Sequence, residues 1–140
     1  MIDGIRQRLL DQAHPLRIHL LGVAGSGMSG IAALLLEMGH DVSGSDRVTS
    51  GEIERLQGLG LKFSSPHSAA AVSGVDAVVY SSAIKPDNVA LVEARRIEVP
   101  CLRRAECLSA ILHTRKGVLV AGTHGKTTTS AMCAHVLNNA

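Results

Sequence analysis

The stretch GVAGSGMSG at residues 22–30 places four glycines in nine positions, directly after an apolar run. Gly25, Gly27 and Gly30 match the G-x-G-x-x-G pattern, in which a turn free of Cβ atoms lets backbone amides approach a diphosphate. The segment that follows carries apolar side chains at helical spacing and ends at Gly39. Such a helix points its positively polarised N-terminus at the same diphosphate. The sequence therefore predicts a strand, a tight turn and a helix that together bind a nucleotide.

Short apolar segments alternate with helical patterns through the rest of the chain. Predicted strands occupy residues 16–23, 41–46, 61–64, 75–83, 99–102 and 116–122, and predicted helices occupy residues 28–40, 50–60, 87–96 and 104–114. We expect Ser50 to cap the second of these helices. Nearly continuous apolar strands indicate a Rossmann-like α/β fold, with a mostly parallel sheet and helices on both faces. Ligands of such sheets bind at the carboxyl ends of the strands.

Asp46 ends the second predicted strand, about twenty residues after the glycine loop. A carboxylate at this place accepts hydrogen bonds from ribose hydroxyls in dinucleotide-binding folds. The alternative is that the glycines only allow the helix to pack closely on the strand. The strand, the helix and Asp46 together favour nucleotide binding. They leave the nucleotide open, because NAD, FAD and nucleotide sugars all present a diphosphate and a ribose.

A second glycine-rich loop, GTHGKTT at residues 122–128, follows an apolar segment and precedes a helical pattern. It indicates a phosphate-binding loop, in which Lys126 neutralises phosphate charge and Thr127 ligates a magnesium ion. The usual spacing has a glycine where this chain has Val120, so the match is imperfect. A capped helix start with polar surface residues is the alternative. His124 is equally consistent with a phosphate contact and with a solvated loop histidine.

Composition argues against several classes of partner. Apolar residues make up 46% of the 140 residues, enough for a packed core, and the net charge is only +2. The absence of a block of one charge and the aromatic content of 1% argue against a nucleic-acid interface. No apolar run is long enough to span a bilayer. We therefore expect a cytoplasmic protein that binds no nucleic acid and inserts into no membrane.

Five stretches, taken in order, resemble the Mur ligase family. They are IHLLGVAGSGMSGIA (18–32), VSGSD (42–46), VVYSSAIKPDN (78–88), VPCLRRAECLSAIL (99–112) and VAGTHGKTTT (120–129). The resemblance implies a three-domain cytoplasmic enzyme. Residues 1–115 would form its UDP-N-acetylmuramate-binding N-terminal domain, and residues 116–140 the truncated beginning of its central ATPase domain. One departure lies in the first loop, where Ala24 and Ser26 stand in place of the glycine and alanine common in the family.

The resemblance implies an ATP-dependent ligase that joins L-alanine to UDP-N-acetylmuramate in peptidoglycan precursor synthesis. The muramate carboxylate takes the γ-phosphoryl group of ATP to give an acyl phosphate, which the amine of L-alanine attacks. Lys126, and Mg²⁺ held by Thr127, would stabilise this transfer. The residues implied to bind ATP are Gly122, Thr123, His124, Gly125, Lys126, Thr127 and Thr128. We expect this chain alone to bind the UDP-sugar without catalysing ligation.

The resemblance also implies the residues of the UDP-sugar site, with the diphosphate on the first loop and the uridine near the end of the second strand. These residues are Ala24, Gly25, Ser26, Gly27, Met28, Ser45, Asp46, Arg47, Ser81, Ser82 and Ala83. Arg103 and Arg104 are either contacts for substrate anions or solvated arginines at a helix start.

Three alternatives stay open. A related ligase that recycles murein tripeptide shares both loops. A NAD(P)-binding Rossmann domain of a dehydrogenase explains the first loop and Asp46, but it leaves the second loop without a use. A non-catalytic nucleotide-binding regulatory module is the third alternative.

Overall fold

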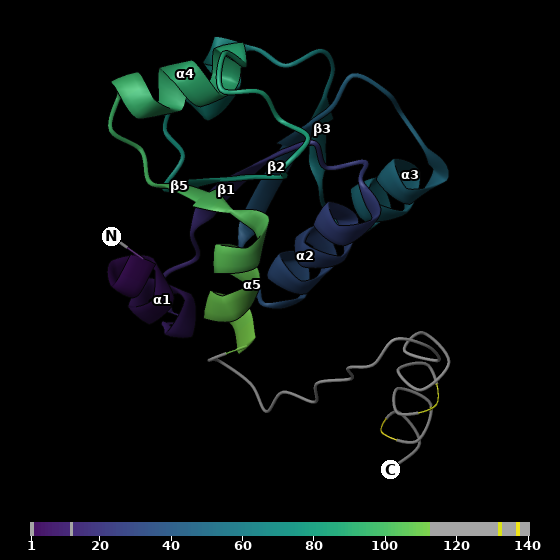
Figure 1. Ribbon diagram of the computed structural model, residues 1–140. Helices are drawn as coiled ribbons and strands as arrows, with labels where there is room; N and C mark the ends of the chain where they lie inside the picture. The colour runs from purple at the N-terminus through teal and green to yellow at the C-terminus, as the bar shows by residue number, and fades with distance from the viewer. Residues whose placement is uncertain (1, 12, 113–131, 133–136, 138–140) are drawn as a thin grey trace, which may run out of the picture.

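The computed structural model describes residues 2–11, 13–112, 132 and 137 and shows a five-stranded sheet with helices on both faces (Figure 1). The strands are β1 (Arg17–Leu21), β2 (Asp41–Ser45), β3 (Lys62–Ser64), β4 (Ala77–Tyr80) and β5 (Cys101–Arg103). The helices are α1 (Ile2–Leu10), α2 (Ser26–Glu37), α3 (Gly51–Gly58), the 3-10 helix η1 (Ala69–Val72), α4 (Val89–Arg96) and α5 (Arg104–Leu112). The predicted alternation of strands and helices is confirmed over this part of the chain.

The sheet is parallel throughout, with strand order β3-β2-β1-β4-β5. After β1 the chain builds outward through β2 and β3, and it then crosses back to place β4 on the other side of β1. The register pairs Leu21 with both Ser45 and Tyr80, so the three strands end at the same level. This reversal of direction opens a crevice at the carboxyl edge, where open α/β sheets bind ligands.

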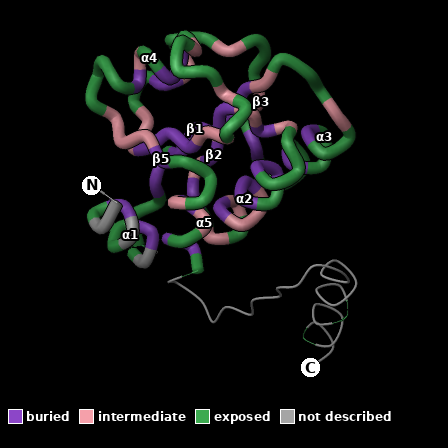
Figure 2. The backbone as a smooth tube through the Cα atoms, viewed as in Figure 1, coloured by how far each residue is buried: buried purple, intermediate pink, exposed green. Residues whose placement is uncertain are grey.

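The two faces of the sheet carry different amounts of helix. Helices α1, α2, α3 and α5 cover one face, and α4 with η1 covers the other (Figure 1). Side chains alternate along β1, so Ile18 and Leu20 join the larger core while Leu21 joins the smaller one. The buried residues lie between the sheet and its helices (Figure 2). Both faces are thus closed, and polar groups gather at the strand ends.

Glycines shape the connection from β1 to α2. Gly22 has a φ of 84°, which lets the chain leave β1 in a left-handed turn, and Gly39, with φ 91°, ends the helix as predicted. Close packing occurs at Gly44 of β2, where an added Cβ would lie 2.8 Å from the Cβ of Val23. Gly30 faces open space instead. The tight approach between β2 and the loop after β1 is therefore made by a glycine outside the sequence motif.

Two local features differ from the sequence expectations. Helix α1 was not predicted, and it buries Ile5 and Leu9 in the larger core, next to α5. These residues stand four positions apart and so share one helix face. Ser50 does precede α3, but its hydroxyl makes no capping hydrogen bond and has no partner within the described residues. The prediction of a hydroxyl cap at Ser50 is wrong, and only the carbonyl of Ser50 accepts helix amides.

Several predictions fall on residues that the structure does not describe. They are the strand at 116–122, the second glycine-rich loop at 122–128 and the domain boundary after residue 115. Within the described ranges, no helix has the length and apolar character needed to cross a bilayer.

Candidate functional site

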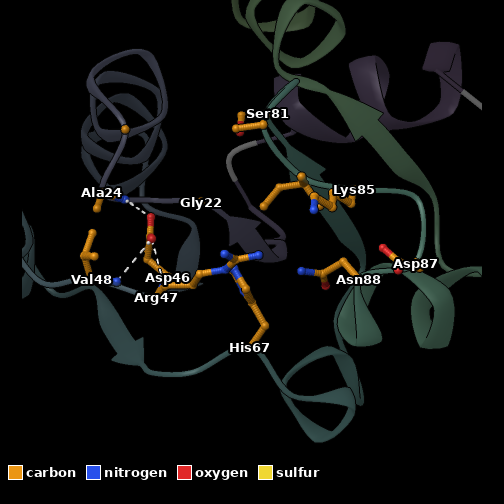
Figure 3. Close-up of a pocket in the computed structure, with 13 residues that line it drawn as sticks. Gly22, Ala24, Asp46, Arg47, Val48, His67, Ser81, Lys85, Asp87 and Asn88 are labelled. Atoms are coloured by element: carbon orange, nitrogen blue, oxygen red, sulfur yellow. Dashed lines mark hydrogen bonds between the residues drawn. The ribbon is translucent and has the colours of Figure 1, made fainter.

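A cavity of about 520 Å³ opens at the carboxyl edge of the sheet, and we call it the first cavity (Figure 3). Its walls come from the loops that follow β1, β2, β3 and β4. The lining residues are Gly22, Ala24, Gly25, Asp46, Arg47, Val48, His67, Ser81, Ala83, Ile84, Lys85, Asp87 and Asn88.

The loop from β1 to α2 is tied to the end of β2. The amides of Gly22 and Val23 both donate to the carbonyl oxygen of Ser45, at 2.9 and 3.3 Å. The amide of Gly25 donates to the carbonyl oxygen of Gly22 at 3.1 Å, which closes the turn. The loop is therefore held in place before any ligand binds.

The first turn of α2 offers three backbone donors. The amides of Ser26, Gly27 and Met28 have no hydrogen-bond partner in the described part of the chain, as is usual for the start of a helix. Gly25, at the N-cap position, supplies no side chain to satisfy them. Free amides and the helix dipole together favour an anion at this point.

Arg104 lies beside this first turn. A Cβ built at Gly27 would lie 2.6 Å from Nη1 of Arg104, so a side chain at this position would displace the guanidinium. Arg104 comes from the start of α5, at the end of β5. The fold thus adds a cation to the amides of α2, and the sequence spacing gave no sign of this.

Asp46 holds two loops together. Its Oδ2 accepts the amide of Ala24 at 3.0 Å, and its Oδ1 accepts the amides of Arg47 and Val48 at 2.7 and 3.4 Å (Figure 3). A carboxylate has about four acceptor positions, so a ribose hydroxyl would share the same oxygens. Asp46 lines the first cavity, and in this structure its partners are backbone amides.

Ser45 does not line the first cavity, because it is fully buried. Its hydroxyl lies between two histidine rings, 3.1 Å from Nε2 of His19 and 2.7 Å from Nδ1 of His67. Nδ1 of His19 lies 2.7 Å from the hydroxyl of Ser43. His67 is the member of this chain that reaches the first cavity. The hydroxyl of Ser45, a residue predicted to lie near the nucleotide, therefore connects to the cavity through His67.

Burial sets the protonation of both rings. Burial lowers the pKa of His19 to about 4, with a smaller contribution from His67. Burial also lowers the pKa of His67, while Asp46 raises it and Arg47 lowers it by smaller amounts. Both rings are therefore neutral near pH 7. Sequence reasoning missed both histidines, and the available signal was His19 inside an otherwise apolar strand.

The opposite wall of the first cavity follows β4. The predicted residues Ser81 and Ala83 lie here, together with Lys85 and Asn88, which sequence reasoning did not select. The side chain of Asn88 accepts the amides of Ala90 and Leu91 at 3.0 and 3.3 Å and so caps α4. Lys85 is exposed and makes no ion pair within the described residues.

A second cavity of about 480 Å³ adjoins the first, because Ser81 and Ile84 line both. Its lining includes Ser82 and the three arginines Arg95, Arg103 and Arg104, and none of its lining residues is acidic. The guanidinium of Arg95 stacks 5.9 Å from the centre of the Tyr80 ring. None of these arginines forms an ion pair with a described residue. The second cavity is therefore suited to an anion.

The predicted substrate residues fall into groups. Ala24, Gly25, Asp46, Arg47, Ser81 and Ala83 surround the first cavity, and Ser82 lines the second. Ser26, Gly27 and Met28 form the first turn of α2, and the side chain of Met28 is buried. The predicted ATP residues, Gly122 to Thr128, lie outside the described ranges.

Comparisons with known proteins give one consistent result. Residues 17–116 match the family model described as Mur ligase family, catalytic domain. A curated relative from Anaeromyxobacter dehalogenans, named UDP-N-acetylmuramate–L-alanine ligase, is 51% identical over 124 residues. This match covers 89% of the chain and 27% of the relative, so the chain spans about a quarter of the length of the curated relatives it matches.

Two solved structures share the fold closely. UDP-N-acetylmuramate–alanine ligase from Thermotoga maritima has a TM-score of 0.81 at 38% identity, over 88% of this chain and 29% of that chain. UDP-N-acetylmuramate:L-alanyl-γ-D-glutamyl-meso-diaminopimelate ligase from Neisseria meningitides has a TM-score of 0.81 at 32% identity, over 89% of this chain and 40% of that chain.

Proposed function

Since this chain belongs to the Mur ligase family, we propose that it is the nucleotide-sugar-binding part of an ATP-dependent ligase that joins L-alanine to UDP-N-acetylmuramate. The observation that carries the proposal is the convergence of free amides and unpaired cations at one edge of the sheet. The amides of Ser26, Gly27 and Met28 meet Arg104 there, and Arg47 and Lys85 line the adjoining first cavity. This is an arrangement for a ligand with several negative charges.

The diphosphate fits the first turn of α2. Backbone donors there need no side-chain movement, and Arg104 supplies a positive charge at the same place. The uridine then occupies the first cavity, with Asp46 and Arg47 on one wall and Ser81 and Ala83 on the other. Arg103 and Arg104 in the second cavity are available to the anionic groups of the sugar side.

The choice between two ligases concerns the substrate that is joined to the nucleotide sugar, an amino acid or a tripeptide, rather than this site. The names of the Thermotoga and Neisseria proteins both contain UDP-N-acetylmuramate, and their TM-scores are equal. The name and the 51% identity of the Anaeromyxobacter relative favour the alanine-adding enzyme. Either way, the part of the molecule described here would hold the same nucleotide sugar.

ATP and Mg²⁺ would belong to the second glycine-rich loop. Among the described residues no group of three histidine, cysteine or acidic side chains could hold a metal ion. In this proposal Thr127 ligates Mg²⁺ and Lys126 contacts the phosphates, so that charge repulsion between triphosphate and muramate carboxylate is offset. The described residues would bind and orient the UDP-sugar so that its carboxylate faces that loop.

Calorimetric titration of the 140-residue chain tests the proposal. We expect UDP-N-acetylmuramate to bind, UDP to compete with it, and NADH to give no heat of binding. Arg47→Ala should weaken UDP-sugar binding roughly tenfold, because a charged hydrogen bond is worth about 1.5–3 kcal/mol. Arg55→Ala, which removes an arginine paired with Glu52 on α3, is the control and should leave affinity unchanged. Tight NADH binding without a response to the UDP-sugar would overturn the proposal in favour of a dehydrogenase domain.

A further inference from the structure

A chain of hydrogen bonds runs along one face of the sheet into the first cavity. It links the Ser43 hydroxyl, the His19 ring, the Ser45 hydroxyl and the His67 ring, with contacts of 2.7, 3.1 and 2.7 Å. The β1–β2 register places His19 opposite Ser43. His19 is 1% exposed and Ser45 is 0% exposed, so water does not reach these two members.

Counting hydrogens leaves two arrangements in which the Ser45 hydroxyl donates to one of the two rings. Ser45 has one hydrogen, so it can donate to only one of its two ring partners. If it donates to Nδ1 of His67, then Nε2 of His19 must carry a hydrogen and donate to Ser45. The neutral His19 then accepts from Ser43, and the neutral His67 carries its hydrogen on Nε2. In the reverse arrangement both rings carry the hydrogen on Nδ1.

The chain therefore couples the two tautomers. His67 presents an N–H donor to the first cavity in one arrangement and a bare nitrogen in the other, and His19 changes with it. Within the described residues Nε2 of His67 has no hydrogen-bond partner, so it is the atom left to meet a ligand. The charged groups lining the same cavity are Asp46, Arg47, Lys85 and Asp87.

We propose that Ser45 and His19 are positioning residues, which fix His67 so that its Nε2–H donates to an oxygen acceptor of the bound nucleotide. The inference rests on the proposed function for its ligand. A nucleotide presents carbonyl and phosphate oxygens, which only accept hydrogen bonds, so each of them selects the arrangement in which all donors point toward the cavity. The buried chain pre-sets the ring orientation, so less freedom is lost on binding.

Nitrogen-15 NMR of the histidine-labelled 140-residue chain reads the tautomers directly, with UDP as the probe. With UDP bound, we expect both His19 and His67 to carry hydrogen on Nε2 and none on Nδ1. A complex in which His67 carries its hydrogen on Nδ1 would overturn the proposal. Among the described residues the His19 ring hydrogen-bonds Ser43 and Ser45, neither of which lines the first cavity, so its response to UDP is a readout that simple packing would not produce.

Two serine variants in β2 and one outside it complete the test. Ser45→Ala breaks the chain next to His67, and we expect UDP affinity to fall roughly five- to tenfold and the His19 signals to become insensitive to UDP. Ser43→Ala removes only the end of the hydrogen-bond chain farthest from the cavity and should lower UDP affinity about twofold. Ser73→Ala, an exposed serine before β4 at the other end of the sheet, is the control and should bind UDP like the unmodified chain. Equal affinity for Ser45→Ala and Ser73→Ala would overturn the proposal.

The ligand-free chain separates this proposal from the function it rests on. Without UDP the two rings still share one tautomer, whichever it is, as long as Ser45 donates its single hydrogen to one of them. Opposite tautomers in the free chain would therefore overturn the coupling even if UDP binds. If UDP fails to bind while the tautomers match, the coupling stands and the proposed nucleotide site fails.

Discussion

The two ends of the parallel sheet differ in how their charged side chains are paired. At the amino end, Asp76 accepts the amide of Arg17 at 2.8 Å and Nη2 of Arg8 at 2.9 Å, and Lys62 pairs with Asp41 at 3.0 Å. At the carboxyl end, Arg47, Lys85, Arg95, Arg103 and Arg104 have no acidic partner among the residues described. Charges at the first end join elements of the fold. Those at the second end are left for a ligand, so the same residue types serve structure at one end and binding at the other.

The largest expected effect concerns His19. This residue belongs to the hydrogen-bond chain that leads to the first cavity, at the carboxyl end of the sheet. Because the folded pKa of His19 is about 4, the unfolded chain takes up a proton below pH 6.5 while the folded chain does not. Stability is therefore complete above pH 6.5 and falls as pH drops toward 4, by about 3 kcal/mol from this residue. Urea unfolding across this range, compared between the unmodified chain and His19→Gln, measures the difference. If the free energy of unfolding changes equally with pH in both proteins, His19 does not titrate in this way.

Charge reversal at the carboxyl end comes next. Arg104→Glu should weaken UDP-N-acetylmuramate binding about 30-fold, because it removes a charged hydrogen-bond donor worth about 1.5–3 kcal/mol beside the diphosphate. Its effect on the free energy of unfolding should stay within about 0.5 kcal/mol, since Arg104 is exposed. Arg55→Glu on α3 is the matched reversal at a residue that lines neither the first nor the second cavity. If calorimetry shows the same loss of affinity for both variants, the unpaired charges at the carboxyl end of the sheet have no special role in binding.

A smaller effect is expected at Asp46, which both lines the first cavity and holds two loops together. Asp46→Asn replaces an acceptor of three backbone amides by a group with a single acceptor oxygen. We expect a loss of about 1 kcal/mol in the free energy of unfolding and a roughly fivefold loss of UDP-sugar affinity, because the amide of Ala24 is no longer held. Chemical denaturation and calorimetry on one preparation measure both quantities. A change in stability with unaltered UDP-sugar affinity would show that Asp46 serves the fold, like the paired charges at the amino end of the sheet.

The smallest effect is expected at the amino end. The amide of Arg17, followed by Arg8, holds the pKa of Asp76 below its usual value. Its contribution to stability is thus present above about pH 4 and is lost as pH falls further. Asp76→Asn should cost less than about 1 kcal/mol at pH 7, since the side chain is partly exposed, and should leave UDP-sugar affinity unchanged. A measurable loss of affinity in this variant would show that the two ends are coupled.

The sequence predicted the layered fold because its signals are local. Apolar strands, helical spacing and turn glycines each occupy a few neighbouring residues, and Gly22 and Gly39 do adopt the positive φ angles that end a strand and a helix. Helix α1 was missed because its two buried residues, Ile5 and Leu9, are a short signal among charged neighbours. The fold class follows from many such patterns, so one missed helix does not alter it.

Much of the site depends on information that a single segment does not contain. The contact between His19 and Ser43 needs the register of two strands, and the approach of Arg104 to Gly27 needs the order of strands across the sheet. The role of Asp46 illustrates the same limit. Its position was expected, whereas its hydrogen bond to Ala24 depends on how closely two loops meet.

The bridge from Arg8 to Asp76 joins residues 68 positions apart in sequence. Helix α1 also packs against α5, which begins at Arg104. During synthesis on the ribosome, helix α1 therefore emerges well before Asp76 and α5. Its apolar face stays uncovered until they are made. Helix α1 would accordingly dock late during folding, although it is made before Asp76 and α5.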